Sequence, residues 1–386
     1  MIHMFDLFSD NRIKPIAFYL PQFHAIPEND AAWGKGFTEW TNVKKAEPLF
    51  PGHYQPRVPL NKNYYDLLDD GVMEWQSELA QQYGVYGFCY YHYWFKDGKK
   101  LLEKPVEQML HNKKITIPFC LSWANENWTK KWDAGNKEII AEQEYGNELE
   151  WESHFQYLKV FFCDDRYIRV NDKPVFIIYR PESIPRLQDM LRYWEKRSSE
   201  TGLKGICFMV QRGESYFNPN FDRGIIEYQI KFEPSFSNNI EKRLEREGLY
   251  TVLGRLGLYN KLRKVHQIIK KTIEGTSSKT GQIAIDYDTI WRQILIPLED
   301  STLIEGAFTD WDNTSRMLNG YRTDGATPEL FGKYIKQLIK KIEDYNEPPV
   351  IFINAWNEWA EGAYLEPDEK YGYAYLEELK QALAYQ

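Results

Sequence analysis

Residues 348–362 read PPVIFINAWNEWAEG, in which a short apolar run leads directly into two carboxylates. The run from Val350 to Ile353 has the length and the β-branched content of a strand that is buried on both faces. Glu358 and Glu361 follow it, beside two tryptophans and two asparagines. A rigid strand that presents two acids among aromatic rings is typical of a glycosidase active site. The alternative interpretation is a pair of capping or surface glutamates.

Similar apolar runs recur along the whole chain and alternate with amphipathic stretches. This alternation predicts parallel strands joined by crossover helices. We count eight candidate strands, at Pro15–Leu20, Val85–Tyr91, Ile115–Leu121, Pro174–Tyr179, Gly205–Val210, Gly224–Ile230, Leu303–Phe308 and Pro349–Asn354. They predict an α/β fold, a single closed (β/α)8 TIM barrel over residues 1–386. The alternative is an open doubly wound sheet, but no G-x-G-x-x-G opens the first helix.

The helices between these strands show an apolar stripe at helical spacing. We expect them at Tyr64–Gln82, Lys104–Asn112, Leu149–Phe162, Ile184–Ser199, Pro328–Asp344 and Tyr373–Ala384. Two connections are longer than usual, residues 23–63 after the first strand and residues 232–291 after the sixth. Long loops at the carboxyl ends of barrel strands usually shape the active site.

The second long connection is rich in lysine and arginine, and apolar residues recur in it at helical spacing. This pattern predicts a helical insertion at residues 232–291. A basic amphipathic helix can lie on an anionic membrane surface, so a peripheral membrane contact through residues 240–275 is one interpretation. The other is an insertion with a solvated charged face.

Composition limits the classes of partner. The 386 residues include 48 Lys and Arg against 56 Asp and Glu, which gives a formal net charge of −8. Such a chain has no global positive field to hold a polyanion, which argues against nucleic acid as a partner. Aromatic residues make up 16% of the chain, and many stand beside polar residues. Because aromatic faces suit sugar rings, we expect an oligosaccharide or polysaccharide substrate.

The cysteines stand singly inside apolar runs, at Cys89, Cys120, Cys163 and Cys207. Without C-x-x-C spacing they predict small buried thiols in a reducing compartment, and no metal site. Residues 1–13 lack the apolar core of a signal peptide, and nowhere do about 18 apolar residues run together. We therefore expect a soluble, cytoplasmic protein without a transmembrane segment or a cofactor.

A barrel gathers the residues that follow its strands around one pocket. Polar and aromatic residues stand at these positions after most of the candidate strands. We therefore expect substrate contacts from Tyr19, Gln22, His24, Trp40, Tyr91, His92, Trp94, Trp123, Asn125, Glu126, Trp128, Arg180, Asp310, Trp311, Trp356 and Asn357. Any one of them alone is more often structural, but their convergence on one rim favours a binding site.

Glycosyl transfer needs one carboxyl group that donates a proton to the leaving oxygen and a second that stays ionised. Glu358 and Glu361 supply both. Their proximity separates their pKa values, because like charges disfavour simultaneous ionisation, and burial against Trp356 and Trp359 raises the pKa of the acid further. The rival pair is Glu126 with Glu358, on different strands and each preceded by asparagine.

Several motifs resemble a known family. The segment Glu358–Gly362, followed by Leu365-Glu366-Pro367, resembles the E-W-x-E-G motif and downstream Glu-Pro of glycoside hydrolase family 99, the retaining endo-α-mannosidases. Four stretches look closer still to the WbsX-like branch, namely Tyr19–His24, Gly36–Trp40, Tyr91–Phe95 and Ser122–Trp128. That branch is similar to family 99, is associated with bacterial O-antigen and capsule clusters, and is often labelled glycosyltransferase. The similarity extends from about Lys14 to Tyr373.

The resemblance implies a (β/α)8 barrel that requires no metal. It implies that Glu358 is the base toward the sugar 2-hydroxyl, which gives a 1,2-anhydro sugar, and that Glu361 is the general acid/base. Ala360 stands where the hydrolases commonly carry histidine. The resemblance therefore supports the chemistry more firmly than the mannosidase specificity.

Three functions follow from these features. The first is a retaining glycoside hydrolase or transglycosylase that acts on a bacterial surface polysaccharide, such as O-antigen or capsule, or on its precursor. The second is a sugar-nucleotide-dependent glycosyltransferase, in which a D-x-D triplet, Asp286-Tyr287-Asp288 or Asp310-Trp311-Asp312, would hold a cation against a diphosphate. The third is a carbohydrate-binding barrel without activity, which would have little use for acids with raised pKa values.

Overall fold

The computed structural model describes residues 5–130, 138–213, 223–237, 283–298, 300–317 and 320–384. Its centre is a closed barrel of eight parallel strands, each paired with the next and the last with the first. The strands in spatial order are β1 (Lys14–Tyr19), β2 (Gly87–Trp94), β4 (Phe119–Trp123), β8 (Lys173–Ile178), β9 (Cys207–Arg212), β10 (Ile226–Lys231), β12 (Leu303–Phe308) and β14 (Val350–Asn354). All eight predicted strands are present, and the predicted TIM barrel is confirmed.

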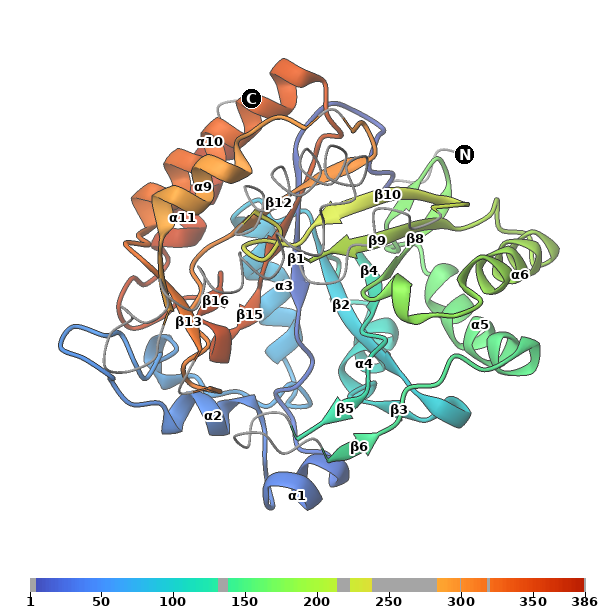
Figure 1. Cartoon of the computed structure of the whole chain (residues 1–386), viewed down its shortest axis with the longest axis horizontal. Coiled ribbons are helices and arrows are strands. Elements are labelled where there is room, and N and C mark those ends of the chain that lie inside the picture. The colour runs from blue at the N-terminus through green and yellow to red at the C-terminus, as the bar shows by residue number, and fades with distance from the viewer. Residues whose placement is uncertain are drawn as a thin grey trace, which may run out of the picture.

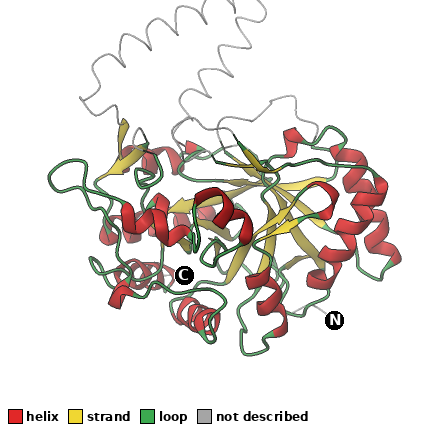
Figure 2. Cartoon of the chain, turned by 90° about the horizontal axis from the view of Figure 1, so that it is seen from below, coloured by secondary structure: helices red, strands yellow, loops and turns green. Residues whose placement is uncertain are grey.

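Helices surround this barrel, with the strands in the middle (Figures 1 and 2). They are α3 (Val72–Gln82), α4 (Lys104–His111), α5 (Glu148–Phe162), α6 (Leu187–Glu200), α9 (Tyr287–Ile294), α10 (Pro328–Tyr345) and α11 (Ala374–Leu383). The loop after β1 carries two short helices, α1 (Pro27–Trp33) and α2 (Glu39–Lys45). Short 3-10 turns lie at η1 (Leu60–Lys62), η2 (Lys96–Gly98), η3 (Pro181–Ser183) and η5 (Trp359–Glu361).

Short strands decorate the loops of the barrel. They are β3 (Lys100–Leu101), β5 (Trp128–Thr129), β6 (Ile139–Ala141), β7 (Arg169–Val170), β11 (Ile283–Asp286), β13 (Tyr321–Asp324), β15 (Asn357–Glu358) and β16 (Ala363–Tyr364). The antiparallel pair β15–β16 folds the segment that carries the proposed acids into a compact hairpin. That segment is therefore a structured element and not a free surface loop.

Three helices were not predicted, and one starts later than expected. α1, α2 and α9 have only seven or eight residues each, too few for a clear period. The helix expected from Tyr64 begins at Val72, after Gly71, which has a φ of 84°. This left-handed conformation suits glycine and interrupts the helical path.

Side chains on the barrel strands alternate between the interior and the helical layer, as the pleat requires. Phe18 lies in the interior, where its ring stacks on Tyr91 at 5.7 Å and meets Phe352 at 5.5 Å. The next residue, Tyr19, points the other way, and its hydroxyl donates to Gln76 of α3 at 2.6 Å.

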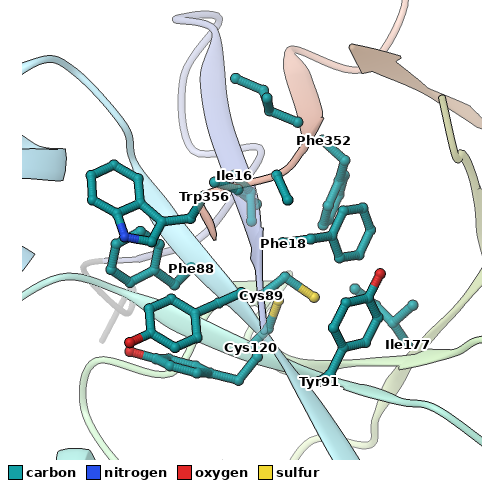
Figure 3. Packing of buried hydrophobic residues seen from close by; sticks show 14 of the residues in the cluster. Ile16, Phe18, Phe88, Cys89, Tyr91, Cys120, Ile177, Phe352 and Trp356 are labelled. Carbon is teal, nitrogen blue, oxygen red and sulfur yellow. The ribbon is translucent and has the colours of Figure 1, made fainter. Parts of the chain in front are cut away.

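The same alternation is visible on β2. Figure 3 shows Phe88 beside Trp356 on one side of the strands, and Tyr91 with Phe18 and Phe352 on the other. Neighbouring residues on a strand therefore pack on opposite sides of it, one toward the barrel interior and the next toward the helices. This alternation decides which of the predicted contacts reach the site.

Three of the four cysteines are buried, but Cys163, at the C-terminal end of α5, is exposed. The prediction of a buried thiol is wrong there, because the apolar run before Cys163 ends with the helix. Most of the predicted insertion, and the proposed membrane contact at residues 240–275, lie outside the described residues. Within the described ranges, no helix combines the length and the apolar composition that crossing a bilayer requires.

Candidate active site

A cavity of about 310 Å³ lies among residues that follow the carboxyl ends of the barrel strands. Seven of the eight strands contribute to it, which is the usual place for a TIM-barrel active site. The lining residues are Leu20, Gln22, Trp33, Tyr91, Tyr93, Ala124, Glu126, Asn127, Trp128, Thr129, Tyr179, Phe232, Ser235, Trp311, Arg316, Glu358 and Glu361. The floor is aromatic, since Tyr91 and Phe232 both pack against the interior ring of Phe18.

Both predicted acids face this cavity. Glu358 ends β15 and is 7% exposed, and Glu361 closes the following 3-10 turn. Asn357 fixes their segment to the end of β1, because its amide accepts from the Leu20 N–H at 2.8 Å and donates to the Leu20 carbonyl at 3.1 Å. A two-point clamp of this kind holds the next residue, Glu358, in one orientation.

Asn125 uses the same device on the other side of the barrel. Its amide accepts from the Arg180 N–H at 2.7 Å and donates to the Arg180 carbonyl at 2.8 Å. The next residue, Glu126, then reaches the rim, where it lies 3.5 Å from the Arg180 guanidinium and its side chain is 43% exposed. Glu126 is therefore much more solvated than Glu358, which makes it the weaker candidate for the buried acid of the pair.

Trp359, between the two acids in sequence, is anchored by Glu366. The buried Glu366 carboxylate accepts from Trp359 Nε1 at 2.6 Å, from Gln76 Nε2 at 2.7 Å and from the Tyr65 hydroxyl at 2.8 Å. Burial raises the pKa of Glu366 to about 7, although these donors oppose the change. Glu366, the glutamate of the Glu-Pro motif, thus fixes the turn that carries the two acids by holding Trp359.

Arg316 is the main residue of the site that was not predicted. Its Nη1 lies 2.5 Å from Glu361, and its Nη2 lies 3.2 Å from Glu358 and 2.7 Å from Glu39. One guanidinium therefore contacts three carboxylates. Arg316 stands in an irregular segment after β12, more than 40 positions from either acid, and belongs to no motif that a single sequence reveals.

The electrostatics of the site favour a protonated acid at neutral pH. Burial, followed by the charge of Glu361, raises the pKa of Glu358 to about 8, although Arg316 opposes the change. Burial also raises the pKa of Glu361, again against Arg316. Since the closest Arg316 contact is to Glu361, we place the proton on Glu358 in the resting site and the charge on Glu361.

Five of the predicted substrate contacts line the cavity: Gln22, Tyr91, Glu126, Trp128 and Trp311. Gln22 Nε2 and Trp311 Nε1 are buried and have no hydrogen-bond partner among the described residues. Buried N–H groups without partners are costly unless a ligand satisfies them. These two donors therefore suit the hydroxyl oxygens of a bound sugar.

Another five predicted contacts point into the layer between barrel and helices, and they do not line the cavity. Tyr19 contacts α3, the ring of His92 lies 2.8 Å from His154 of α5, Trp94 stacks on His154 at 4.5 Å, and Trp123 and Trp356 pack against Trp194 and Phe88. For the residues of β1, β2 and β4 the pleat explains this placement, because each lies one position from an inward-facing residue.

The remaining predicted contacts, apart from the clamps already described, also hold the scaffold. His24 Nδ1 donates to the Pro21 carbonyl at 2.9 Å, and Trp40 Nε1 donates to the Tyr65 carbonyl at 2.8 Å. Asp310 lies 2.8 Å from the Arg57 guanidinium. None of these three side chains lines the cavity within the described ranges.

The two D-x-D triplets are engaged in hydrogen bonds. Asp312 accepts from His53 Nε2 at 2.8 Å and from Gln55 Nε2 at 2.9 Å, so it ties the loop after β1 to the site. In the other triplet, Asp286 caps α9, and Asp288 accepts from the Tyr334 hydroxyl at 2.6 Å. Both triplets thus have a role in holding the fold.

Comparisons with known proteins agree with this architecture. The chain is 36% identical over 375 residues to the uncharacterized protein WxcX of Xanthomonas campestris pv. campestris, strains B100 and ATCC 33913. The match covers 95% of this chain and 49% of WxcX, so the chain spans about half the length of these curated relatives.

Two solved structures share the fold. One is the GH99 endo-alpha-mannosidase from Bacteroides thetaiotaomicron, with a TM-score of 0.54, 13% identity and 97% of each chain covered. The other is a glycoside hydrolase-like protein, with a TM-score of 0.56, 11% identity and coverage of 97% of this chain and 94% of the other. The family described as Glycosyltransferase WbsX matches residues 15–379. This chain belongs to that family.

Proposed function

We propose that this chain is a retaining glycoside hydrolase or transglycosylase that acts on a bacterial surface polysaccharide, such as O-antigen or capsule, or on its precursor. The observation that carries the proposal is the placement of Glu358 and Glu361 in one cavity, both with raised pKa values. A pair of acids in which one is protonated and the other ionised is what glycosyl transfer requires. The fold that the chain shares with the GH99 endo-alpha-mannosidase also supports the proposal of a glycoside hydrolase.

The roles of the two acids follow the family resemblance. Glu358 takes the proton of the sugar 2-hydroxyl while O2 attacks C1, and Glu361 gives a proton to the leaving oxygen as its bond to C1 breaks. Water or an acceptor hydroxyl then opens the 1,2-anhydro ring at C1 and gives its proton to Glu361. O2 recovers its proton from Glu358, and two inversions at C1 retain the configuration.

The resting site holds its proton on the opposite acid. Glu358 has the pKa of about 8, whereas the base must be ionised when it meets the 2-hydroxyl. Under this proposal the proton passes from Glu358 to Glu361 once substrate fills the cavity and covers Arg316. Both acids contact this one guanidinium, which itself stays protonated, so the proton passes between the two carboxylates directly or through a water molecule.

A glycosyltransferase is the second candidate, because the family description names that activity. A closed barrel differs from the open nucleotide-binding sheet in which a diphosphate usually lies at a switch point. The D-x-D side chains also serve as caps and loop anchors. We therefore rank transfer from a nucleotide sugar below hydrolysis and transglycosylation.

Substitution of the two acids tests the proposal. With oligosaccharides from bacterial surface polysaccharides as substrates, Glu361→Gln should lower turnover by about 10² to 10⁴ while glycan binding stays measurable. Substrates with a good aryl leaving group should recover much of this loss in Glu361→Gln but not in Glu358→Gln, because only the former lacks the proton donor. Unchanged turnover in Glu361→Gln refutes the assignment. Mn²⁺-dependent affinity for nucleotide sugars would instead favour the transferase.

A further inference from the structure

Glu39 contacts Arg316 in the site, but the proposed mechanism gives it no role. It is the first residue of α2, its exposed fraction is 0%, and it belongs to the stretch Gly36–Trp40. One carboxylate oxygen, Oε1, accepts from Arg316 Nε at 2.9 Å and lies 2.7 Å from Nη2. A buried carboxylate with this arrangement fixes both the position and the direction of the guanidinium.

Arg316 therefore presents its remaining edge to the two acids at unequal distances. Nη1 lies 2.5 Å from Glu361, while Nη2, which also contacts Glu39, lies 3.2 Å from Glu358. One positive charge stands among three carboxylates, which leaves two negative charges uncompensated, so charge alone favours at least one bound proton in the group. The inequality of the contacts decides which carboxylate stays ionised.

We propose that Glu39 and Arg316 form a positioning pair that makes the two acids unequal, with one proton between them and Glu361 as the ionised partner in the resting site. The inference rests on the proposed function for its purpose, because only a catalyst needs one acid and one base. Its physical content, the distribution of one proton, is independent of substrate and turnover. Within the described residues, no second cation forms ion pairs with both acids, so the inequality between them depends on this pair.

The other titratable groups that face the acids come from the neighbouring elements. Tyr91 and Tyr93 of β2 face Glu358, and burial raises the pKa of both, so they stay neutral. Glu126 lies across the cavity on the rim, and Asp312 donates its backbone N–H to the Glu361 carbonyl at 2.6 Å. Among the described residues, Arg316 is the cation with ion pairs to both acids.

The two members of the pair have opposite effects on the acids. Loss of the Arg316 charge removes the cation that favours the carboxylates, so both pKa values should rise by about 1 to 3. Loss of the Glu39 charge removes a repelling anion and leaves Arg316 more strongly available to the acids, so both pKa values should fall. A merely structural role for either residue predicts no such opposition in sign.

The test is a pH titration, without ligand, of the full chain with ¹³C-labelled glutamate carboxyl groups, followed by NMR. Glu358→Gln and Glu361→Gln assign the two resonances. Glu39→Gln, Arg316→Gln and Arg316→Lys are the variants, and Arg197→Gln, which removes an outer ion pair with Glu152 on the helical layer, is the matched control. Far-ultraviolet circular dichroism confirms that each variant is folded.

We expect upward movement of both titrations in Arg316→Gln, downward movement by about 1 in Glu39→Gln, a smaller difference between the two acids in Arg316→Lys, which keeps the charge but not the separate contacts, and no movement in Arg197→Gln. Movement in the same direction for Glu39→Gln and Arg316→Gln, or a wild-type Glu361 that titrates above Glu358, overturns the inference. If Arg316→Gln does not fold, the sign in Glu39→Gln decides. Because turnover is not measured, failure here leaves the glycosidase proposal standing, and failure of Glu361→Gln kinetics leaves this result unchanged.

Discussion

Replacement of Glu358 by glutamine should change how the stability of the protein depends on pH. The pKa of Glu358 is raised from 4.5 to about 8, chiefly by burial and next by Glu361. Each tenfold difference in proton affinity between the folded and unfolded states is worth about 1.4 kcal/mol, so the upper limit is about 5 kcal/mol. Because Glu361 shares the proton and Arg316 can adjust, we expect about 2 to 4 kcal/mol.

The sign follows from which state binds more protons. Between pH 4.5 and about 8 the folded protein holds a proton on Glu358 that the unfolded chain has lost, so the stability of the wild type falls as pH rises through this window. Below the window this contribution is fully favourable. Glutamine cannot ionise, so the variant lacks this fall.

Equilibrium urea denaturation at pH 5 and pH 8.5, followed by tryptophan fluorescence, measures the effect. We compare the change in unfolding free energy from pH 5 to pH 8.5 in the two proteins. This change should be more favourable in Glu358→Gln than in the wild type by about 2 to 4 kcal/mol. Glu369→Gln, at an exposed position, is the control and should run parallel to the wild type. If Glu358→Gln also runs parallel, the acid is not held protonated by its surroundings, and the electrostatic reasoning fails.

Three further changes probe the scaffold and the alternation of the strands. Tyr93 lines the cavity, so Tyr93→Phe should weaken glycan binding several-fold in isothermal titration with little change in stability. His92 lies one position away and faces the helical layer, so His92→Phe should lower stability by about 1 to 3 kcal/mol in urea denaturation, because His154 loses its buried partner. The reverse pattern would contradict the assigned strand faces. Asn357→Ala should cost about 2 kcal/mol, since Leu20 loses both contacts of the clamp, and should lower turnover through misplacement of Glu358. Arg57→Met should cost about 3 to 5 kcal/mol, because the buried Asp312 and the half-buried Asp310 lose the cation between them, and a loss below 1 kcal/mol would show that the ion pairs are not coupled to folding.

The barrel could be predicted because parallel strands leave a simple trace. Most of them are buried on both faces and contain a largely apolar run, as in VIFIN at residues 350–354, and the helices between them are amphipathic. Short helices such as α1 and α2 leave no comparable trace, because seven residues hold barely two turns. Their positions are set by contacts between the loop after β1 and the barrel.

The candidate site could be predicted in part. The two acids and the aromatic rim share strand ends, and the rule for TIM barrels places them together. Which neighbour faces the cavity depends on the phase of the pleat. All four residues from Tyr91 to Trp94 are aromatic with a polar edge, so their types do not indicate which of them face the cavity. Arg316 and Glu39 are brought together only by the folded chain, 277 positions apart, so a single sequence holds no signal for their pairing.

The central claim is that the cavity between Glu358 and Glu361 binds the glycan at the bond to be broken. A crystal structure of Glu361→Gln soaked with an oligosaccharide from a bacterial surface polysaccharide measures this directly. We predict a sugar ring in the cavity, with its 2-hydroxyl within hydrogen-bond distance of Glu358 and its ring oxygens or hydroxyls satisfying Gln22 Nε2 or Trp311 Nε1. A glycan bound elsewhere while this cavity stays empty would contradict the account.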